Sequence, residues 1–139
     1  MRDKEGIFEK IRVCLLKNEG IRACFVFGSF VTNDFNDDSD LDIAVLVNEK
    51  IQSLKLLSMR QEVERLTDRD VDLIQIDNDL SLILRNEIAT KGELVFSNDT
   101  KASDRFFEKT LQMYLDFMRF REPLEEAYIQ KKTDSTKDG

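Results

Sequence analysis

The sequence has 139 residues, a net charge of −7 and 41% hydrophobic residues. This length and balance fit one globular domain with a real core and exclude a disordered chain. The negative charge argues against direct binding of DNA or RNA, which needs a basic face. The sequence contains no histidine, which excludes Ser-His-Asp triads and histidine zinc sites. Catalysis would therefore depend on carboxylates, hydroxyls, backbone amides, lysine, arginine or a metal bound by oxygen atoms.

Two cysteines, Cys14 and Cys24, lie among apolar neighbours and form no CxxC pattern. We expect buried free thiols and no disulfide. The first residues do not resemble a signal peptide, and no apolar run approaches the ~18 residues that a membrane span requires. We therefore expect a cytoplasmic protein that does not bind a membrane.

The first half of the chain predicts one helix and two strands. Residues 4–18 have apolar side chains at helical spacing and end before Gly20, as a helix does. Residues 21–27 are rich in β-branched and aromatic residues and predict a buried strand. A polar, turn-rich segment follows. Residues 41–47 are apolar on both faces, which predicts a central strand covered on two sides.

The second half alternates helices and strands. The patterns predict a helix at 51–66, a strand at 71–76, a helix at 80–90 and a short strand at 94–96. A helix at 103–130 follows, in which Pro123 is expected to cause a kink or a break, and residues 131–139 are expected to be a flexible tail. Residues 1–130 are predicted to form a single domain. This order predicts an α+β (mixed α/β) fold, in which helices cover a small mixed sheet and the last helix is long.

A glycine, a serine and two aspartates stand where chemistry is expected. Gly28 and Ser29 follow the first strand, and Asp40 and Asp42 open the second. Glycine lets a ligand approach the backbone closely, and the amides and hydroxyl that follow can bind phosphate oxygens. Asp40 and Asp42 project from one face of a strand, about 7 Å apart. Carboxylates so placed repel each other without a cation, and Mg²⁺ takes one or two carboxylates together with substrate phosphates.

A third carboxylate is expected from another strand if two metal ions are bound. Asp72 lies inside the third strand and is the first choice, whereas Asp70 is nearer the turn and is the alternative. Acid-rich loops are most often solvated turns, and residues 33–42 also alternate as in a calcium loop. A calcium loop is excluded because Ser39 and Val45 replace its required Gly and Glu. Acids at the starts of two apolar strands favour a metal site, since burying them together without a counter-ion is costly.

The spacing Gly28-Ser29-x10-Asp40-x-Asp42, followed by Asp72, resembles the signature of the polymerase-β-type nucleotidyltransferase superfamily. The short length resembles its minimal members. Over residues 5–120 the chain is similar to the MntA-type antitoxins that are encoded beside HEPN-domain toxins. This likeness includes three further segments: Asp70-Val71-Asp72-Leu73, then Glu87-Ile88 with Lys91-Gly92-Glu93-Leu94, and Phe107-x-Lys109-Thr110-x2-Met113-Tyr114.

The resemblance implies a nucleotidyltransferase fold and an antitoxin that transfers AMP from ATP to a tyrosine of its cognate HEPN ribonuclease toxin. It implies that Asp40, Asp42 and Asp72 are catalytic and bind two Mg²⁺ ions with the triphosphate. Asp72 would also help the tyrosine hydroxyl to lose its proton. The nucleotide-binding residues would be Gly28, Ser29 and Ser39. The partners would be ATP and the toxin, with which the chain would form a larger complex.

Two alternatives remain open. The chain would be a binding antitoxin that blocks the toxin by contact, with a dispensable nucleotide site, or a small-molecule nucleotidyltransferase, whose relatives generally add a helical substrate domain. The last helix is relevant to the binding-antitoxin alternative, because its aromatic and apolar residues lie on two sides of the helix. One side would pack on the chain's own domain, and the other would bind the toxin or a second copy.

Overall fold

A four-stranded sheet forms the centre of the molecule. The computed structural model describes residues 4–32 and 40–137. The strands are β1 (Ile21–Phe27), β2 (Leu41–Val47), β3 (Val71–Ile76) and β4 (Glu93–Ser97), and their order in the sheet is β3-β2-β1-β4. β2 and β3 are parallel, whereas β1 is antiparallel to both β2 and β4. The sheet is therefore mixed, and the predicted α+β fold is confirmed.

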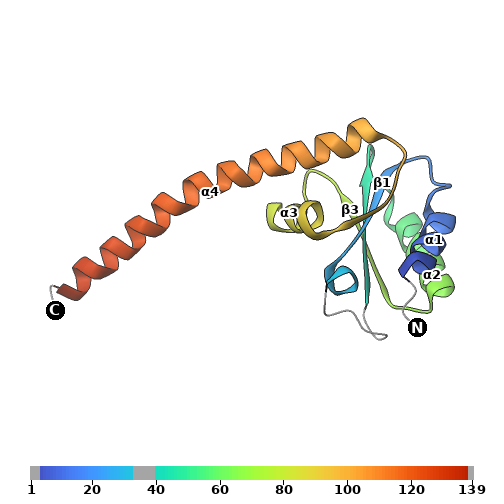
Figure 1. The fold of residues 1–139 in the computed structure, drawn as a ribbon, viewed down its shortest axis with the longest axis horizontal. Coiled ribbons are helices and arrows are strands. Elements are labelled where there is room, and N and C mark those ends of the chain that lie inside the picture. Colours follow the sequence, from blue (N-terminus) through green and yellow to red (C-terminus); the bar gives the residue numbers. More distant parts are fainter. Residues whose placement is uncertain (1–3, 33–39, 138–139) are drawn as a thin grey trace.

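Helices cover both faces of the sheet. They are α1 (Lys4–Leu15), the short 3-10 helix η1 (Gly28–Val31), α2 (Ser53–Thr67), α3 (Leu82–Lys91) and α4 (Thr100–Lys137). α1 and α2 lie on one side, and α3 with the first turns of α4 on the other (Figure 1). Side chains alternate along a strand, so β1 buries Cys24 and Val26 under α1 and α2, and Phe25 under α3 and α4. β2 is buried on both faces in the same way, as its apolar sequence predicts.

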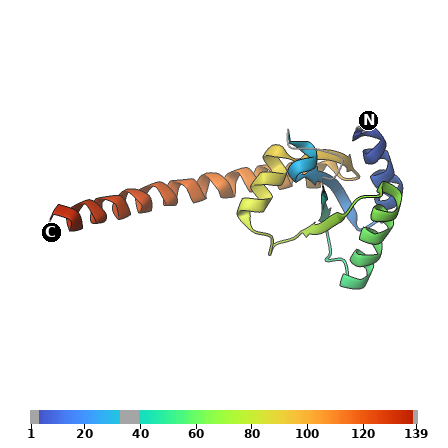
Figure 2. The same ribbon diagram turned by 90° about the horizontal axis from the view of Figure 1, so that it is seen from below.

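α4 packs on the sheet only through its first turns and then extends away from the domain (Figure 2). Phe106 contacts Phe25, with ring centroids 5.6 Å apart. After Thr110, which is buried, every side chain that the structure describes is half-buried or exposed. The helix also continues past Pro123 to Lys137, so the expected break is absent and the helix is longer than predicted. Good helix formers on both sides of the proline explain this continuity, because they offset part of its cost.

Side-chain contacts, one local and one between distant residues, set two helix ends that differ from the prediction. α1 ends at Leu15 because the side-chain amide of Asn18 donates to the carbonyl of Leu15, at 3.4 Å. α2 begins at Ser53 because Gln75 holds the peptide of Ile51 outside the helix. The Gln75 side chain accepts from Ile51 N at 2.6 Å and donates to Ile51 O at 3.0 Å.

Local N-caps set the starts of α3 and α4. The hydroxyl of Ser81 accepts a hydrogen bond from Leu84 N at 3.3 Å, and the carboxylate of Asp99 accepts one from Ala102 N at 3.1 Å. Both bonds satisfy amides that have no partner within the first turn. α3 therefore starts two positions later than predicted, and α4 three positions earlier.

The predicted state of the cysteines is confirmed. Cys14 and Cys24 are free and buried, and burial raises the pKa of both thiols, because the apolar core disfavours the thiolate. Within residues 4–32 and 40–137, no helix combines the length and the apolar character that a membrane crossing needs.

Candidate active site

Asp42 and Asp72 lie side by side at one end of the sheet. Each is the second residue of its strand, and the parallel register of β2 and β3 pairs them directly. This register is fixed next to them by the bond from Leu41 N to Asp70 O, at 2.9 Å. Neighbouring strands are about 4.8 Å apart, so the carboxylates of one paired position are close neighbours. By strand alternation both lie on the face that α3 and α4 cover, together with Ala44 and Ile74.

Gly28 closes the site from the end of β1. Its φ is +74°, in the left-handed region that residues with a side chain rarely adopt. A Cβ at this position would overlap the carboxylate oxygen Oδ2 of Asp42, because Phe27 pairs with Asp42 across β1 and β2. Glycine is therefore required for two reasons, the turn itself and the space that the Asp42 carboxylate occupies.

The electrostatics of Asp42 indicate a shortage of positive charge. Burial raises the pKa of the Asp42 carboxyl, and the negative charges of Asp72, Asp40 and Glu87 raise it further, in that order. Both effects disfavour the carboxylate form. A cation at this end of the sheet would favour the carboxylate form of Asp42, since it would stabilise the carboxylates that now repel each other.

The other predicted site residues differ in where they lie. Asp40 is exposed directly before β2 and acts on Asp42 through its charge. Asp70 precedes β3, whereas Asp72 pairs directly with Asp42 across β2 and β3, so the register favours Asp72 as the third acid. Ser29 is half-buried in η1, and its hydroxyl makes no hydrogen bond within the described part of the chain. Ser39 lies outside the described residues.

Two further residues at this end were given no role by the sequence. Glu87 of α3 is half-buried and adds to the negative field at Asp42. Only the packing of α3 on the sheet brings Glu87 towards Asp42. In the sequence, an acid between apolar helix positions is a weak indication of such a role. Arg69 lies over the ring of Phe30, 5.5 Å from its centroid. This cation–π contact joins η1 to the start of β3.

The donor set fits a magnesium ion that is shared with a substrate. Among the residues that the structure describes, no three Cys, Asp or Glu side chains converge on one point that would hold a metal alone. Mg²⁺ needs no such cage, because it usually keeps several waters and binds through one or two carboxylates plus substrate phosphates. Asp42 and Asp72 supply hard oxygen ligands of this kind. The phosphates would approach from the side of Gly28 and Ser29, where the backbone can come close to a ligand.

Comparison with known proteins identifies the family of the chain. The family model described as "Polymerase beta, Nucleotidyltransferase" matches residues 9–101. Protein adenylyltransferase MntA of Shewanella oneidensis is 28% identical over 95 residues, which are 68% of this chain and 66% of that protein. Protein adenylyltransferase MntA of Thermococcus cleftensis is 32% identical over 74 residues, 53% of this chain and 75% of that protein. The chain thus spans about two thirds of the first of these relatives.

Solved structures share the fold. One is a complex of the tri-AMPylated Shewanella oneidensis HEPN toxin with MNT antitoxin, with a TM-score of 0.71, 23% identity and coverage of 91% of this chain and 99% of that chain. Another is a toxin–antitoxin complex with AMP-PNP, with a TM-score of 0.72, 24% identity and coverage of 88% and 98%. These likenesses show the shared fold, and the family model, which covers more than half of the sequence, shows that the chain belongs to the polymerase beta nucleotidyltransferase family.

Proposed function

We propose that this chain is an antitoxin that works as a Mg²⁺-dependent protein adenylyltransferase. It transfers AMP from ATP to a tyrosine of a HEPN ribonuclease toxin and so neutralises it in the cytoplasm. The observation that carries this proposal is the direct pairing of Asp42 with Asp72 beside Gly28. The names of the MntA relatives, which are protein adenylyltransferases, support the reaction class. The free, buried thiols suit a reducing compartment.

Asp40, Asp42 and Asp72 are the residues that would hold Mg²⁺, most simply as two ions that share the triphosphate. The metal supplies charge neutralisation on the phosphate oxygens. Gly28, with the amides that follow it and the Ser29 hydroxyl, binds those oxygens. A larger set of nucleotide contacts would include Ser39.

The transfer itself is an in-line displacement at the α-phosphorus of ATP. The tyrosine oxygen forms a bond to phosphorus, and the bond from phosphorus to the bridging oxygen of pyrophosphate breaks. Asp72 accepts the tyrosine proton, because it is the more exposed acid of the pair. The role of the chain is positioning and charge compensation, which a protein without histidine can supply.

The reaction is tested by incubating the chain and the protein product of the neighbouring gene with α-labelled ATP and Mg²⁺. Label is expected on a tyrosine of the partner, and the Asp42→Asn variant is expected to transfer much less. Lys10→Gln, an exposed change on α1 far from the acids, is the control and should transfer normally. An unlabelled partner, with ATP binding intact, would rule out the proposed reaction.

A second function, inhibition by contact alone, is favoured by α4. The helix extends from the domain with large exposed apolar side chains, among them Leu111, Phe117 and Phe120. Such a surface suits a protein partner. The double change Asp40→Ala with Asp42→Ala separates the two functions. Loss of neutralisation supports the enzyme, whereas full neutralisation by the double variant supports the contact inhibitor.

A further inference from the structure

A pocket lies at the opposite end of the sheet face that carries the acids. It has a volume of about 340 Å³ and is lined by Leu46 of β2, Ile76 of β3 and Phe106 of α4. Asp42 and Asp72 are not part of its lining. Leu46 follows Asp42 by four residues on the same face of β2, so the pocket and the acids are about 13 Å apart along the strand.

Basic side chains from four parts of the chain converge on this pocket. They are Arg22 of β1, Lys50 of the segment between β2 and α2, Arg85 of α3, and Arg105 and Lys109 of α4. Two acids, Asp77 and Asp99, also line it. The pocket therefore has an excess of positive charge in a protein whose net charge is −7. This local excess runs against the overall field and calls for an explanation.

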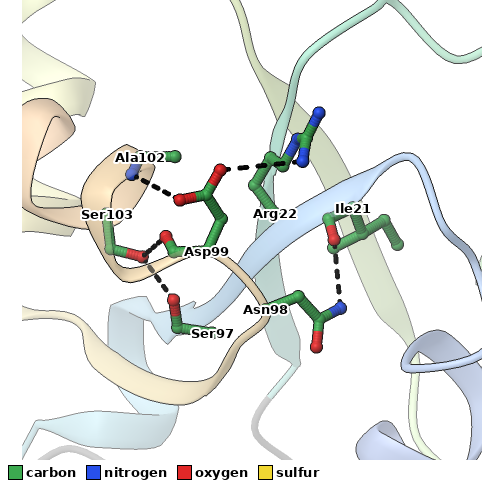
Figure 3. Close-up of polar contacts among 7 residues, drawn as sticks. All are labelled: Ile21, Arg22, Ser97, Asn98, Asp99, Ala102 and Ser103. Atoms are coloured by element: carbon green, nitrogen blue, oxygen red, sulfur yellow. Dashed lines mark hydrogen bonds and ion pairs between the residues drawn. The ribbon is translucent and has the colours of Figure 1, made fainter.

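One wall of the pocket is already neutralised. Arg22 pairs with Asp99 at 3.6 Å, and Asp99 also caps α4 through Ala102 N (Figure 3). The hydroxyl of Ser103 joins this wall to Ser97 at 2.7 Å. These contacts fix the start of α4 against the start of β1 and use the charge of Asp99. Among the described residues, Arg22 is the basic side chain of the pocket that pairs with that carboxylate.

Arg85 carries a buried charge without a carboxylate partner. Its residue is 7% exposed, Nε donates to the carbonyl of Leu80 at 3.1 Å, and Nη2 donates to the carbonyl of Asp77. Within residues 4–32 and 40–137, no acid lies within ion-pair distance of this guanidinium. Neutral carbonyls satisfy donors but do not cancel the charge, and a buried cation is costly unless an anion compensates it. An anion in the pocket would do so.

Three exposed cations line the same pocket as Arg85 and have no ion pairs of their own in the described part of the chain. Lys50 is held near the pocket because Gln75 binds the peptide of the next residue, Ile51, through two hydrogen bonds. Arg105 and Lys109 are one helical turn apart on α4 and point from the same side. Four cations therefore surround one hollow.

We propose that this pocket binds a small phosphorylated ligand, such as inorganic pyrophosphate or a nucleoside monophosphate. Several cations around one point match the multiple charge of phosphate groups, and arginine binds phosphate through two parallel hydrogen bonds. The volume suits a ligand of this size, and Phe106 with Leu46 offers an apolar floor for a part that carries no phosphate. The proposal does not depend on the transfer reaction, because the pocket shares no residue with the acids.

The test uses the full chain in buffer with EDTA, so that no divalent cation can bring phosphate to the acids. Pyrophosphate and AMP are titrated by calorimetry, and backbone amide shifts are followed by NMR. Arg105→Glu with Lys109→Glu is expected to weaken binding at least about tenfold, which corresponds to about 1.4 kcal/mol. The control, Lys101→Glu with Arg119→Glu, makes the same charge change at exposed positions of α4 that do not line the pocket and should change affinity by less than about threefold.

Binding of either probe, with shifts at Ala102 and Phe106, supports the site, and the stronger probe identifies which phosphate chemistry it prefers. Equal affinities of the two double variants, or shifts centred on Gly28 and Asp42, would overturn it. If neither probe binds at a concentration of about 1 mM, the proposal is also overturned. A hexaglutamate peptide that binds more tightly than pyrophosphate would show an acidic-peptide surface and contradict the phosphate class. Because Arg105 and Lys109 are exposed, the variant is expected to fold, and circular dichroism checks this.

Discussion

The face of the sheet that α3 and α4 cover has an acidic end and a basic end. Asp42 and Asp72 lie where β2 and β3 begin, and Arg85 and Lys109 line the pocket where these strands end. The ends are about 13 Å apart along β2, and no ion pair joins them in the described part of the chain. Each end therefore keeps its own shortage of counter-charge. One sheet face can in this way serve two ligands of opposite charge.

The two ends are also built differently. The acidic end depends on backbone register, because the Asp42–Asp72 pairing and the position of Gly28 leave little freedom to the carboxylates. The basic end depends on long side chains from several elements, which reach one hollow from different directions. We therefore expect substitutions at the acidic end to have the larger effects, and the predictions below begin there.

The largest effect is expected from Asp72→Asn. It removes the carboxylate that faces Asp42 and should lower the rate of AMP transfer about 1,000-fold, the loss typical of one essential charge-stabilising group. Asp70→Asn is the matched control, since it makes the same change two residues earlier in the turn before β3, and should lower the rate by less than about threefold. Single-turnover transfer assays measure both. A reversed order of the two variants would make Asp70 the third acid.

The second-largest effect is expected from Gly28→Ala, which changes the geometry of the site but none of its charges. The added methyl group would force the Asp42 carboxylate to turn away, and a φ of +74° is strained for alanine. A displacement of about 1 Å can lower a rate about 100-fold, and the strain should lower the free energy of unfolding by about 1–2 kcal/mol. Gly20→Ala is the control, because a Cβ there meets no atom within 4 Å. Normal transfer by Gly28→Ala would mean that Asp42 does not need its present orientation.

The acidic end could be predicted from the sequence, whereas the basic end could not. Gly28, Asp40 and Asp42 lie within one short segment, and apolar runs with β-branched residues located β1, β2 and β3 at their observed bounds. Contacts between distant residues were not visible in the sequence. The Gln75–Ile51 bonds moved the start of α2, and only tertiary packing brings Glu87 towards Asp42. The basic pocket depends on such packing for every one of its residues.

The charge shortage at the acidic end predicts a gain in stability for Asp42→Asn. The pKa of Asp42 is raised in the folded protein, so the folded state holds this proton more tightly than the unfolded state does. The associated stability is fully present below the unfolded pKa of about 3.9 and is lost as pH rises through the folded pKa. At pH 7 in EDTA the variant should therefore have a higher free energy of unfolding and a higher Tm than the wild type.

The same variant also tests whether bound Mg²⁺ stabilises the folded protein through the Asp42 carboxylate. As pH falls through the raised folded pKa, the wild-type carboxyl is protonated, so the difference in Tm from Asp42→Asn should shrink. Mg²⁺ with ATP should raise the Tm of the wild type more than that of the variant, because binding to the folded state stabilises it. Thermal unfolding by circular dichroism across this pH range measures both effects. A variant less stable than the wild type at pH 7 in EDTA would show that the acids are already compensated.

The smallest effect is expected beyond the sheet. Phe120 is 74% exposed on the part of α4 that has left the domain, so Phe120→Ser removes almost no buried surface. The free energy of unfolding should change by less than about 0.5 kcal/mol, and both ends of the sheet face should keep their affinities. Phe106→Ala, on the same helix but packed on Phe25, should cost about 3 kcal/mol or more. Reduced binding of the partner by Phe120→Ser, with folding and pyrophosphate affinity unchanged, would place the partner contact on exposed α4 and separate it from both charged ends.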